Sequence, residues 1–441
     1  MNSIFVGLVL TGFLTVAWQQ VRWIPAGDSP SPMENLSKAI VQSAGGSVEL
    51  AISLIGVMAL FLGLMKVAES GGLLEIIARL IRPLMSRLFP EVPPDHPATG
   101  AMILNISANL MGLGNAATPF GIRAMQELEK LNPRPGTATN AMVLFVAINT
   151  AGITLLPTSV IALRTAAGSA NPAGILPTTL FASFCATLLV VVAAKAYQRL
   201  FPFTNEAGLS TQKLREGKQD EIDENPGETR NAVQDQAIAA PPAYPVWVSR
   251  LALIVLIAII PLTIAFGRVI SPWVIPSLTV GFLAFGFARK VRIYEAFVEG
   301  AKEGFQVAVR IIPYLVAILV SIGMVRSSGA IDAAANALGA FTAGMGLPPE
   351  GILMAIMRPL SGSGAYGVLA SIINDPAIGP DSYTGYLVST LQGSSETTFY
   401  VLAVYFGAVQ VKRIRHALVA GLTAEFAAVI AAVAICSYLY G

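Results

Sequence analysis

Hydrophobic residues gather along this chain in long blocks that are separated by shorter polar segments. About 20 apolar residues in a helix cross a membrane, because each residue adds about 1.5 Å and the hydrocarbon layer is about 30 Å thick. The first block has no positive residue before it and no small-residue cleavage pattern after it, so we expect a retained helix rather than a signal peptide. The pattern predicts nine spans, at residues 4–21, 48–66, 138–163, 176–197, 248–266, 272–288, 305–325, 386–407 and 416–440.

Two further apolar segments, 99–120 and 351–372, are interrupted at their centres by Asn, Ser, Gly and Pro. Each could supply two helices of about ten residues, which rise about 15 Å and reach only the middle of a membrane. The pattern predicts two re-entrant hairpins, whose broken backbone is tolerated where protein or water surrounds it. An ordinary kinked helix is the alternative for each segment.

A long polar stretch, 204–243, separates the apolar blocks into two groups. It contains KLREGKQDEIDENPGETR and almost no aromatic residue, which is typical of a disordered or loosely helical linker. The sequence therefore predicts a membrane half at 1–201, a polar cytoplasmic linker at 202–245 and a second membrane half at 246–441.

Composition agrees with this division, since 54% of the 441 residues are hydrophobic and only 12% are charged. Ordinary soluble domains have roughly a quarter of their residues charged. The chain is therefore predicted to be an all-α polytopic membrane protein. Its net charge of +2 gives no basic excess for a nucleic-acid partner.

Enzyme chemistry has little support in the sequence. The two cysteines lie in apolar stretches and the two histidines are far apart, so neither a disulfide framework nor a metal site is expected. No Gly-rich phosphate loop or paired-carboxylate motif is present, and Ser361 has no nearby histidine to activate it. We expect a protein that is not an enzyme and that holds no cofactor.

Positive residues set the expected orientation. With the N-terminus in the cytoplasm, most of the 28 lysines and arginines face inward, as the positive-inside rule requires. The protein is then expected in the inner (plasma) membrane. The basic residues expected outside are Arg22, Lys38, Arg164, Arg268, Arg326 and Arg358.

The two halves carry the same order of elements. The segments around Ser107 and Asn149 can be laid on those around Ser361 and Gln392. In the expected topology each span runs opposite to its counterpart, so the repeat is inverted. Inverted repeats with matching interrupted segments indicate a transporter whose site lies at the middle of the bilayer.

A polar block from Gln392 to Thr398 interrupts the apolar span 386–407. A carboxylate and hydroxyl groups are costly to bury at this depth, so the block marks a functional site. The half-helices of the hairpins offer free N–H groups to an anionic or carbonyl-bearing ligand. The residues expected to face a small solute or an ion are Asn105, Ser107, Asn109, Asn115, Asn149, Thr150, Arg358, Ser361, Ser363, Gln392, Ser394, Ser395, Glu396 and Thr397.

Two members of this set have a structural alternative. Arg358 could form an ion pair with Glu396 or bind a ligand carboxylate. Glu396 could be a buried carboxylate satisfied by its Ser and Thr neighbours, or it could bind a coupling cation, H⁺ or Na⁺. Because Glu396 aligns with Ile153 in the first half, any single protonatable position would be Glu396 alone.

Long strings in both halves resemble a known family. SANLMGLGNAATPFGIRAM, from Ser107, resembles spore maturation protein A. RPLSGSGAYG, from Arg358, and GPDSYTGYLVSTLQGSSETTFYVLAVYFGAVQVKRIRHAL, from Gly379, resemble spore maturation protein B. The resemblance implies a fusion of the two within the nucleoside-recognition, or gate, superfamily.

That resemblance implies a fold like the concentrative nucleoside transporters, in which two hairpins and two partly unwound helices hold substrate and coupling ion. The first hairpin lacks their glutamine-threonine-glutamate signature, which argues against a nucleoside substrate. Neither hairpin has the cysteine motif of the superfamily's ferrous-iron transporters, which argues against iron. The four elements would map onto 99–120, 138–163, 351–372 and 386–407.

The sequence as a whole predicts a transporter of a small polar or anionic solute, with the lipid bilayer and that solute as partners and a homo-oligomer left open. The alternative is a membrane scaffold that does not transport and that supports envelope or spore maturation, including dehydration of the spore core. A water-filled cavity lined by both hairpin tips would favour transport, and a closed polar core would favour the scaffold.

Overall fold

The protein is almost entirely helical in the computed structural model, which describes residues 2–24, 30–112, 117–201, 244–330 and 343–441. Within these residues no strand forms, and the one extended contact is an isolated bridge between Thr137 and Arg413. The predicted all-α class is confirmed. The predicted linker lies almost wholly outside the described residues, so the division into three parts stays a prediction.

Among the residues that the structure describes, three helices are long and apolar enough to cross a membrane: Pro32–Ser70, Pro172–Leu200 and Ala417–Tyr440. In a helix, the backbone N–H and C=O groups form hydrogen bonds with one another, and they need these bonds because the hydrocarbon layer offers no hydrogen-bond partner. Further apolar helices of 10–17 residues accompany these three within the described residues. The chain is therefore a membrane protein.

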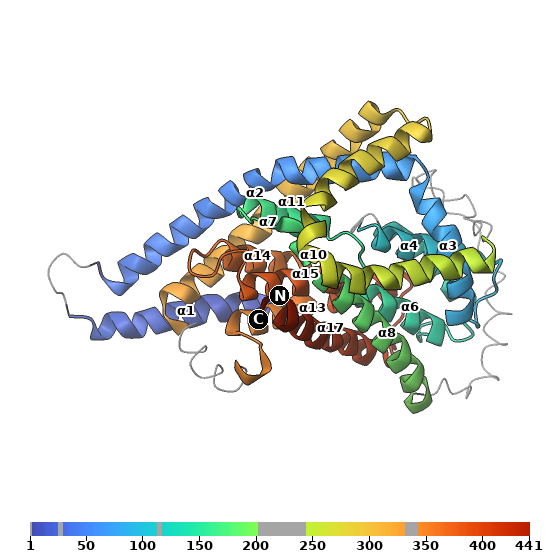
Figure 1. The fold of residues 1–441 in the computed structure, drawn as a ribbon. Helices are drawn as coiled ribbons and strands as arrows, with labels where there is room; N and C mark the ends of the chain where they lie inside the picture. The colour runs from blue at the N-terminus through green and yellow to red at the C-terminus, as the bar shows by residue number, and fades with distance from the viewer. Residues whose placement is uncertain (1, 25–29, 113–116, 202–243, 331–342) are drawn as a thin grey trace, which may run out of the picture.

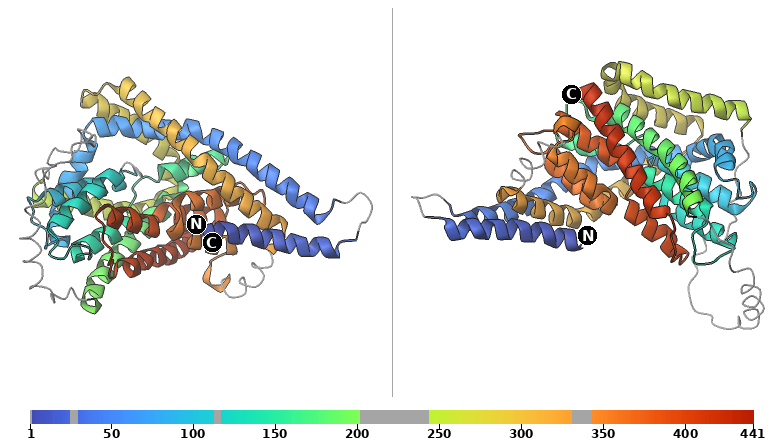
Figure 2. Two further views of the ribbon diagram at one scale, coloured as in Figure 1. Left: turned by 180° about the vertical axis from the view of Figure 1, so that it is seen from behind. Right: turned by 90° about the horizontal axis from the view of Figure 1, so that it is seen from below.

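Of the six long helices that the structure describes, α1, α2 and α11 pack against one another. α2 and α11 lie side by side with α1 against them, and Figures 1 and 2 show α1 and the first part of α2 extending away from the other helices. The long helices are α1 (Asn2–Arg22), α2 (Pro32–Ser70), α8 (Leu176–Leu200), α10 (Val246–Ala288), α11 (Ile293–Ser327) and α17 (Ala417–Tyr440).

Two of the predicted spans merge in α10. The segments 248–266 and 272–288 form one helix of 43 residues, although Pro261, Pro272 and Pro276 lie inside it. A proline removes one backbone hydrogen bond from a helix, and where the residues on both sides stay helical the helix bends at the proline. Figure 1 shows this bend in α10. The two predicted spans are thus joined in one bent helix, in which the apolar stretches Val246–Leu262 and Pro272–Ala288 match them closely, and the number of membrane crossings that they make stays a prediction.

Pairs of short helices occur where the sequence predicted interrupted segments. α4 contacts α5 and α13 contacts α14, and the choice between a hairpin and a kinked helix stays open for each pair. The chain is not helical between α6 and α7 or between α15 and α16, so the partly unwound helices are confirmed, while re-entry into a membrane stays a prediction. The pairs are α4 (Pro97–Leu110) with α5 (Thr118–Lys130), α6 (Asn140–Ala151) with α7 (Thr158–Ala166), α13 (Pro349–Leu360) with α14 (Gly362–Ile373), and α15 (Tyr383–Ser394) with α16 (Thr398–Ala408).

Side-chain oxygens start several of these short helices. Thr139 accepts from the backbone N–H of Met142 at the start of α6, and Ser382 does the same for Gly385 in α15. Such N-caps satisfy donors that have no partner within the helix. The remaining elements are α3 (Leu73–Leu88), η2 (Pro172–Ile175) and η3 (Ala343–Met345).

α6 lies in the middle of the first-half core. Every residue from Ala141 to Ala151 is buried. α8 and α17 pack against α6 and against each other. The broken end of α6 is thus held inside protein, where an unwound backbone in a membrane protein is tolerated.

Small residues let α2 and α11 approach closely. A methyl group at Gly300 would overlap the backbone oxygen of Leu62, and one at Gly304 would lie 2.7 Å from the backbone oxygen of Met58. Helices in membranes associate largely through such close packing of small residues.

We expect Gly300→Val to push α2 and α11 apart and to destabilise the protein by about 1–3 kcal/mol, the usual cost of overpacking. Gly56→Val on α2 is the matched control, because nothing lies within 4 Å of a methyl group there. Thermal unfolding of both purified variants in detergent measures the difference. Equal melting temperatures would contradict the close packing at Gly300.

Candidate functional site

The two unwound segments touch each other. The backbone N–H of Glu396, in the break between α15 and α16, donates to the carbonyl oxygen of Thr150 near the end of α6, at 2.8 Å. Gly152 follows with φ +50°, and a methyl group there would lie 3.1 Å from Cγ of Glu396. Residues that are far apart in sequence, Asn149 and Gln392 with their neighbours, therefore meet at one place.

The first hairpin lies against the first break. The backbone N–H of Leu155 donates to the carbonyl oxygen of Leu110, at the end of α4, at 2.9 Å. Gly112 has φ +77°, and a methyl group there would overlap the carbonyl oxygen of Leu156. Only glycine fits this contact, since it tolerates positive φ and has no side chain.

The second hairpin lies against the second break. Arg358, buried at the end of α13, donates through Nη1 to Oγ1 of Thr397 at 3.1 Å. Its Nη2 lies 3.7 Å from Oε2 of Glu396. Ser361 separates α13 from α14 and caps α14 by accepting from the N–H of Gly364 at 3.0 Å, with its Oγ 3.5 Å from that of Ser363.

Polar side chains of the first half and Tyr405 of the second half form a hydrogen-bonded network. Asn109 donates to Oδ1 of Asn149 at 2.8 Å, and the Tyr405 hydroxyl donates to the same oxygen at 3.3 Å. Asn105 donates to the Tyr405 hydroxyl at 3.1 Å and to the carbonyl oxygen of Ala117 at 2.9 Å. Most of these groups are satisfied within the protein, as a closed polar core requires.

The side chains of two predicted site residues of the first half form hydrogen bonds within their own helices. Ser107 donates to the carbonyl oxygen of Ile103 at 2.8 Å and Thr150 to that of Val146 at 3.1 Å, each one turn earlier in its own helix. This bonding satisfies the hydroxyl without a ligand. Asn115 lies outside the described residues.

The second half leaves buried polar atoms without partners. Nε of Arg358 and Oε1 of Gln392 are buried and make no hydrogen bond. In the first half, the buried Oδ1 of Asn105 also makes none. The side chain of Glu396 is 43% exposed although its neighbours are buried. Since an unpaired buried polar group costs about 1–3 kcal/mol, each such atom calls for an explanation.

Of the remaining predicted residues, Ser394 donates weakly to the carbonyl oxygen of Leu391 at 3.5 Å. Ser395 instead donates to Oε2 of Glu425 in α17, at 2.7 Å. Glu425 and Tyr405 are contacts that the sequence analysis missed. Glu425 could have been found, because it is the single charged residue in α17 and intramembrane acids are functional candidates; Tyr405 carries no such signal in its apolar helix.

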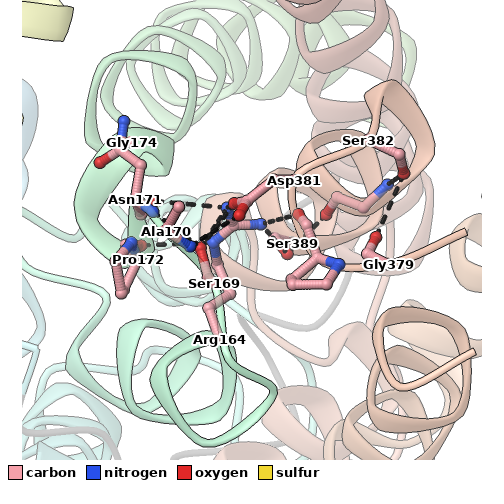
Figure 3. Close-up of polar contacts among 12 residues, drawn as sticks. Arg164, Ser169, Ala170, Asn171, Pro172, Gly174, Gly379, Asp381, Ser382 and Ser389 are labelled. Carbon is pink, nitrogen blue, oxygen red and sulfur yellow. Dashed lines mark hydrogen bonds and ion pairs between the residues drawn. The ribbon is translucent and has the colours of Figure 1, made fainter. Parts of the chain in front are cut away.

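Arg164 of α7 ties the two halves together, a role the sequence did not suggest. Figure 3 shows its guanidinium between the loop at 169–174 and the segment at 379–389. Nη2 pairs with Oδ1 of Asp381 at 2.8 Å, and the group lies 4.3 Å from the ring centre of Tyr386. Its other donors bond the backbone oxygens of Asn171, Pro172 and Pro380 and the hydroxyls of Ser169 and Ser389.

A cavity of about 690 Å³ lies elsewhere, between α2, α11 and the end of α14. Its polar lining includes Gln42, Glu49, Arg326 and Asn374, and it includes none of the predicted site residues. Arg326 pairs there with Asp375 at 3.0 Å. This cavity is therefore separate from the meeting point of the two breaks.

Comparison with known proteins gives one family match and three similar chains. The family model described as Gate, nucleoside recognition, matches residues 51–167 and 308–412. The chain is 43% identical to spore maturation protein A of Bacillus subtilis (strain 168) over 169 residues, which are 38% of this chain and 84% of that protein. It is 46% identical to spore maturation protein B of the same organism over 167 residues, 38% of this chain and 93% of that protein.

A solved structure, a variant of CNTnw in an outward-facing state, matches 99% of this chain and all of its own chain. The sequence identity is 12% and the TM-score is 0.44.

Proposed function

Because this chain belongs to the Gate (nucleoside recognition) family and joins regions similar to spore maturation proteins A and B, we propose that it transports a small polar or anionic solute across the inner membrane. The solute would bind where the two breaks meet, between Arg358 of α13, Gln392 of α15 and Glu396. The two hairpins would move with the bound solute.

The observation that carries this proposal is that two buried side-chain atoms of the second half, Nε of Arg358 and Oε1 of Gln392, make no hydrogen bond within the protein. A buried donor that bears charge and a buried amide acceptor together suit a carboxylate or an amide-bearing ligand. The side chain of Glu396, which is 43% exposed, connects the proposed binding site to the protein surface. A solute that bonds these atoms would offset the cost of burying them.

A second function is favoured by the hydrogen-bonded network around Asn149. This network of Asn105, Asn109, Asn149 and Tyr405 has the form expected of a membrane scaffold. The names of the two relatives, spore maturation proteins A and B, fit that alternative. The two functions differ in whether a solute binds at the breaks.

A thermal-shift screen of the purified full chain against nucleosides, dipeptides, organic acids and cations tests for binding. The transport proposal predicts that a compound with a carboxylate or an amide raises the melting temperature of the wild type. The shift should be lost in Arg358→Leu if that protein still unfolds cooperatively. No shift with any compound would favour the scaffold.

Uptake of such a compound into proteoliposomes tests transport directly. We expect Glu396→Gln to reduce uptake tenfold or more while its melting temperature stays near that of the wild type, because the change removes the charge and keeps the shape. Glu303→Gln is the matched control, since Glu303 is a half-exposed acid of α11 away from the breaks. Uptake at the wild-type rate by Glu396→Gln would remove Glu396 from the mechanism.

A further inference from the structure

Glu425 is a buried acid in an otherwise apolar membrane helix. It is the single charged residue among the 24 of α17, and it is 6% exposed. Charged side chains at this depth are costly, and they mark ion or proton pathways when they occur.

Both carboxyl oxygens of Glu425 hold the break between α15 and α16. Ser395, which ends α15, donates to Oε2 at 2.7 Å, and Thr398, which begins α16, donates to Oε1 at 3.1 Å. Gly421, one turn earlier, allows close contact, since a methyl group there would lie 2.6 Å from Cγ2 of Thr398. One side chain of an unbroken helix thus fixes both ends of the unwound segment that carries Glu396.

Few charges face Glu425 from the helices around it. Arg358 of α13 and Glu396 are the charged groups that act on it. α6, α15 and α16 contain no charged residue, and Lys195 and Arg199 of α8 are exposed. The ion pair of Arg358 is made with Glu396, at 3.7 Å.

The balance of charge in this cluster favours a proton on Glu425 rather than on Glu396. Two ionised carboxylates beside one arginine would leave a net negative charge in a buried cluster, which is expensive unless the group neutralises. Glu396 is half exposed and has Arg358 as its partner, whereas Glu425 is bonded only by neutral hydroxyls. A hydroxyl can donate to a carboxylate or accept from a carboxylic acid, so Ser395 and Thr398 suit either state.

We propose that Glu425 is a proton-binding site and that its proton is the ion coupled to movement of the break. The coupling part rests on the proposed transport function; the proton site does not. When the proton leaves, the carboxylate accepts from both hydroxyls and holds Ser395 and Thr398 firmly. When the proton binds, one of these two bonds must reverse or break, and the segment that carries Glu396 gains freedom to move.

Infrared difference spectra of the purified full chain between about pH 6 and about pH 9, a range in which exposed carboxylates are already ionised, test the proton site, with the proton itself as the probe. We expect a carboxylic acid band in the wild type that disappears as the pH rises. Glu425→Gln should lose this band and Glu396→Gln should keep it. A titrating band that survives in Glu425→Gln, or its absence from the wild type, would overturn the proposal.

A second variant guards against misfolding. Glu425→Asp keeps the acid and should retain a shifted band, whereas a merely structural role predicts no band in either protein. If the band is present but no solute is taken up, the proton site stands and the transport proposal fails. If solute is taken up equally with and without a pH gradient, the coupling role of Glu425 fails while transport stands.

Discussion

Replacing Arg164 by leucine is expected to destabilise the protein by about 3 kcal/mol or more, because each buried acceptor that loses its partner costs about 1–3 kcal/mol. The change leaves Asp381 without its cation and takes donors away from the backbone oxygens of Pro172 and Pro380. Because the guanidinium is fully buried, water cannot replace it without opening the contact between the two halves.

Thermal unfolding of purified variants measures this effect. Arg164→Lys should recover little of the loss, since an ammonium group cannot supply the planar fork that reaches several acceptors at once. Lys130→Leu is the surface control: Lys130 is 63% exposed, and its partner Glu127 keeps Arg123 at 2.9 Å, so the loss should be only about 0–1 kcal/mol. A loss for Arg164→Leu no larger than that for Lys130→Leu would show that Arg164 does not hold the halves together.

Arg164 also shows why part of the structure could not be predicted. The sequence placed it among the outward-facing charges at the end of a span, a reasonable inference for a lone arginine after an apolar stretch. Its acceptors are mostly backbone oxygens, which every residue carries, and Pro380 and Asp381 lie more than 200 positions later. Neither residue type nor spacing could connect them.

The breaks, in contrast, were predictable from local chemistry. Gly152 and Pro157 in one span, and Ser394 to Thr397 in the other, favour local unwinding, because glycine and proline weaken a helix and hydroxyls compete for its backbone. The joining of two predicted spans in α10 was not predicted, because proline can either bend or end a helix. Which outcome occurs depends on neighbours that the sequence does not show.

The candidate site was only partly predictable for a related reason. Asn109, Asn149, Arg358 and Glu396 were chosen by residue type, and the structure places the first two together and the last two together. Whether such a group bonds a neighbour or stays unpaired is decided by a few tenths of an ångström between helices. Periodicity and spacing carry no information at that scale.

Gly112→Ala is expected to separate the first hairpin from the unwound segment. The added methyl group would overlap the carbonyl oxygen of Leu156, and the residue would keep φ +77°, which costs a non-glycine residue about 1–2 kcal/mol. A backbone oxygen cannot turn aside as a flexible side chain could, so the hydrogen bond from Leu155 to Leu110 should break.

Hydrogen–deuterium exchange at residues 154–157 measures that separation. Exchange should accelerate tenfold or more, because a local loss of about 1.4 kcal/mol already changes an opening equilibrium by that factor. Gly136→Ala is the matched control: its φ of +82° brings the same backbone cost, and nothing lies within 4 Å of a methyl group there. If both variants exchange alike at 154–157, then backbone strain alone explains the result, and the hairpin does not depend on the missing side chain of Gly112.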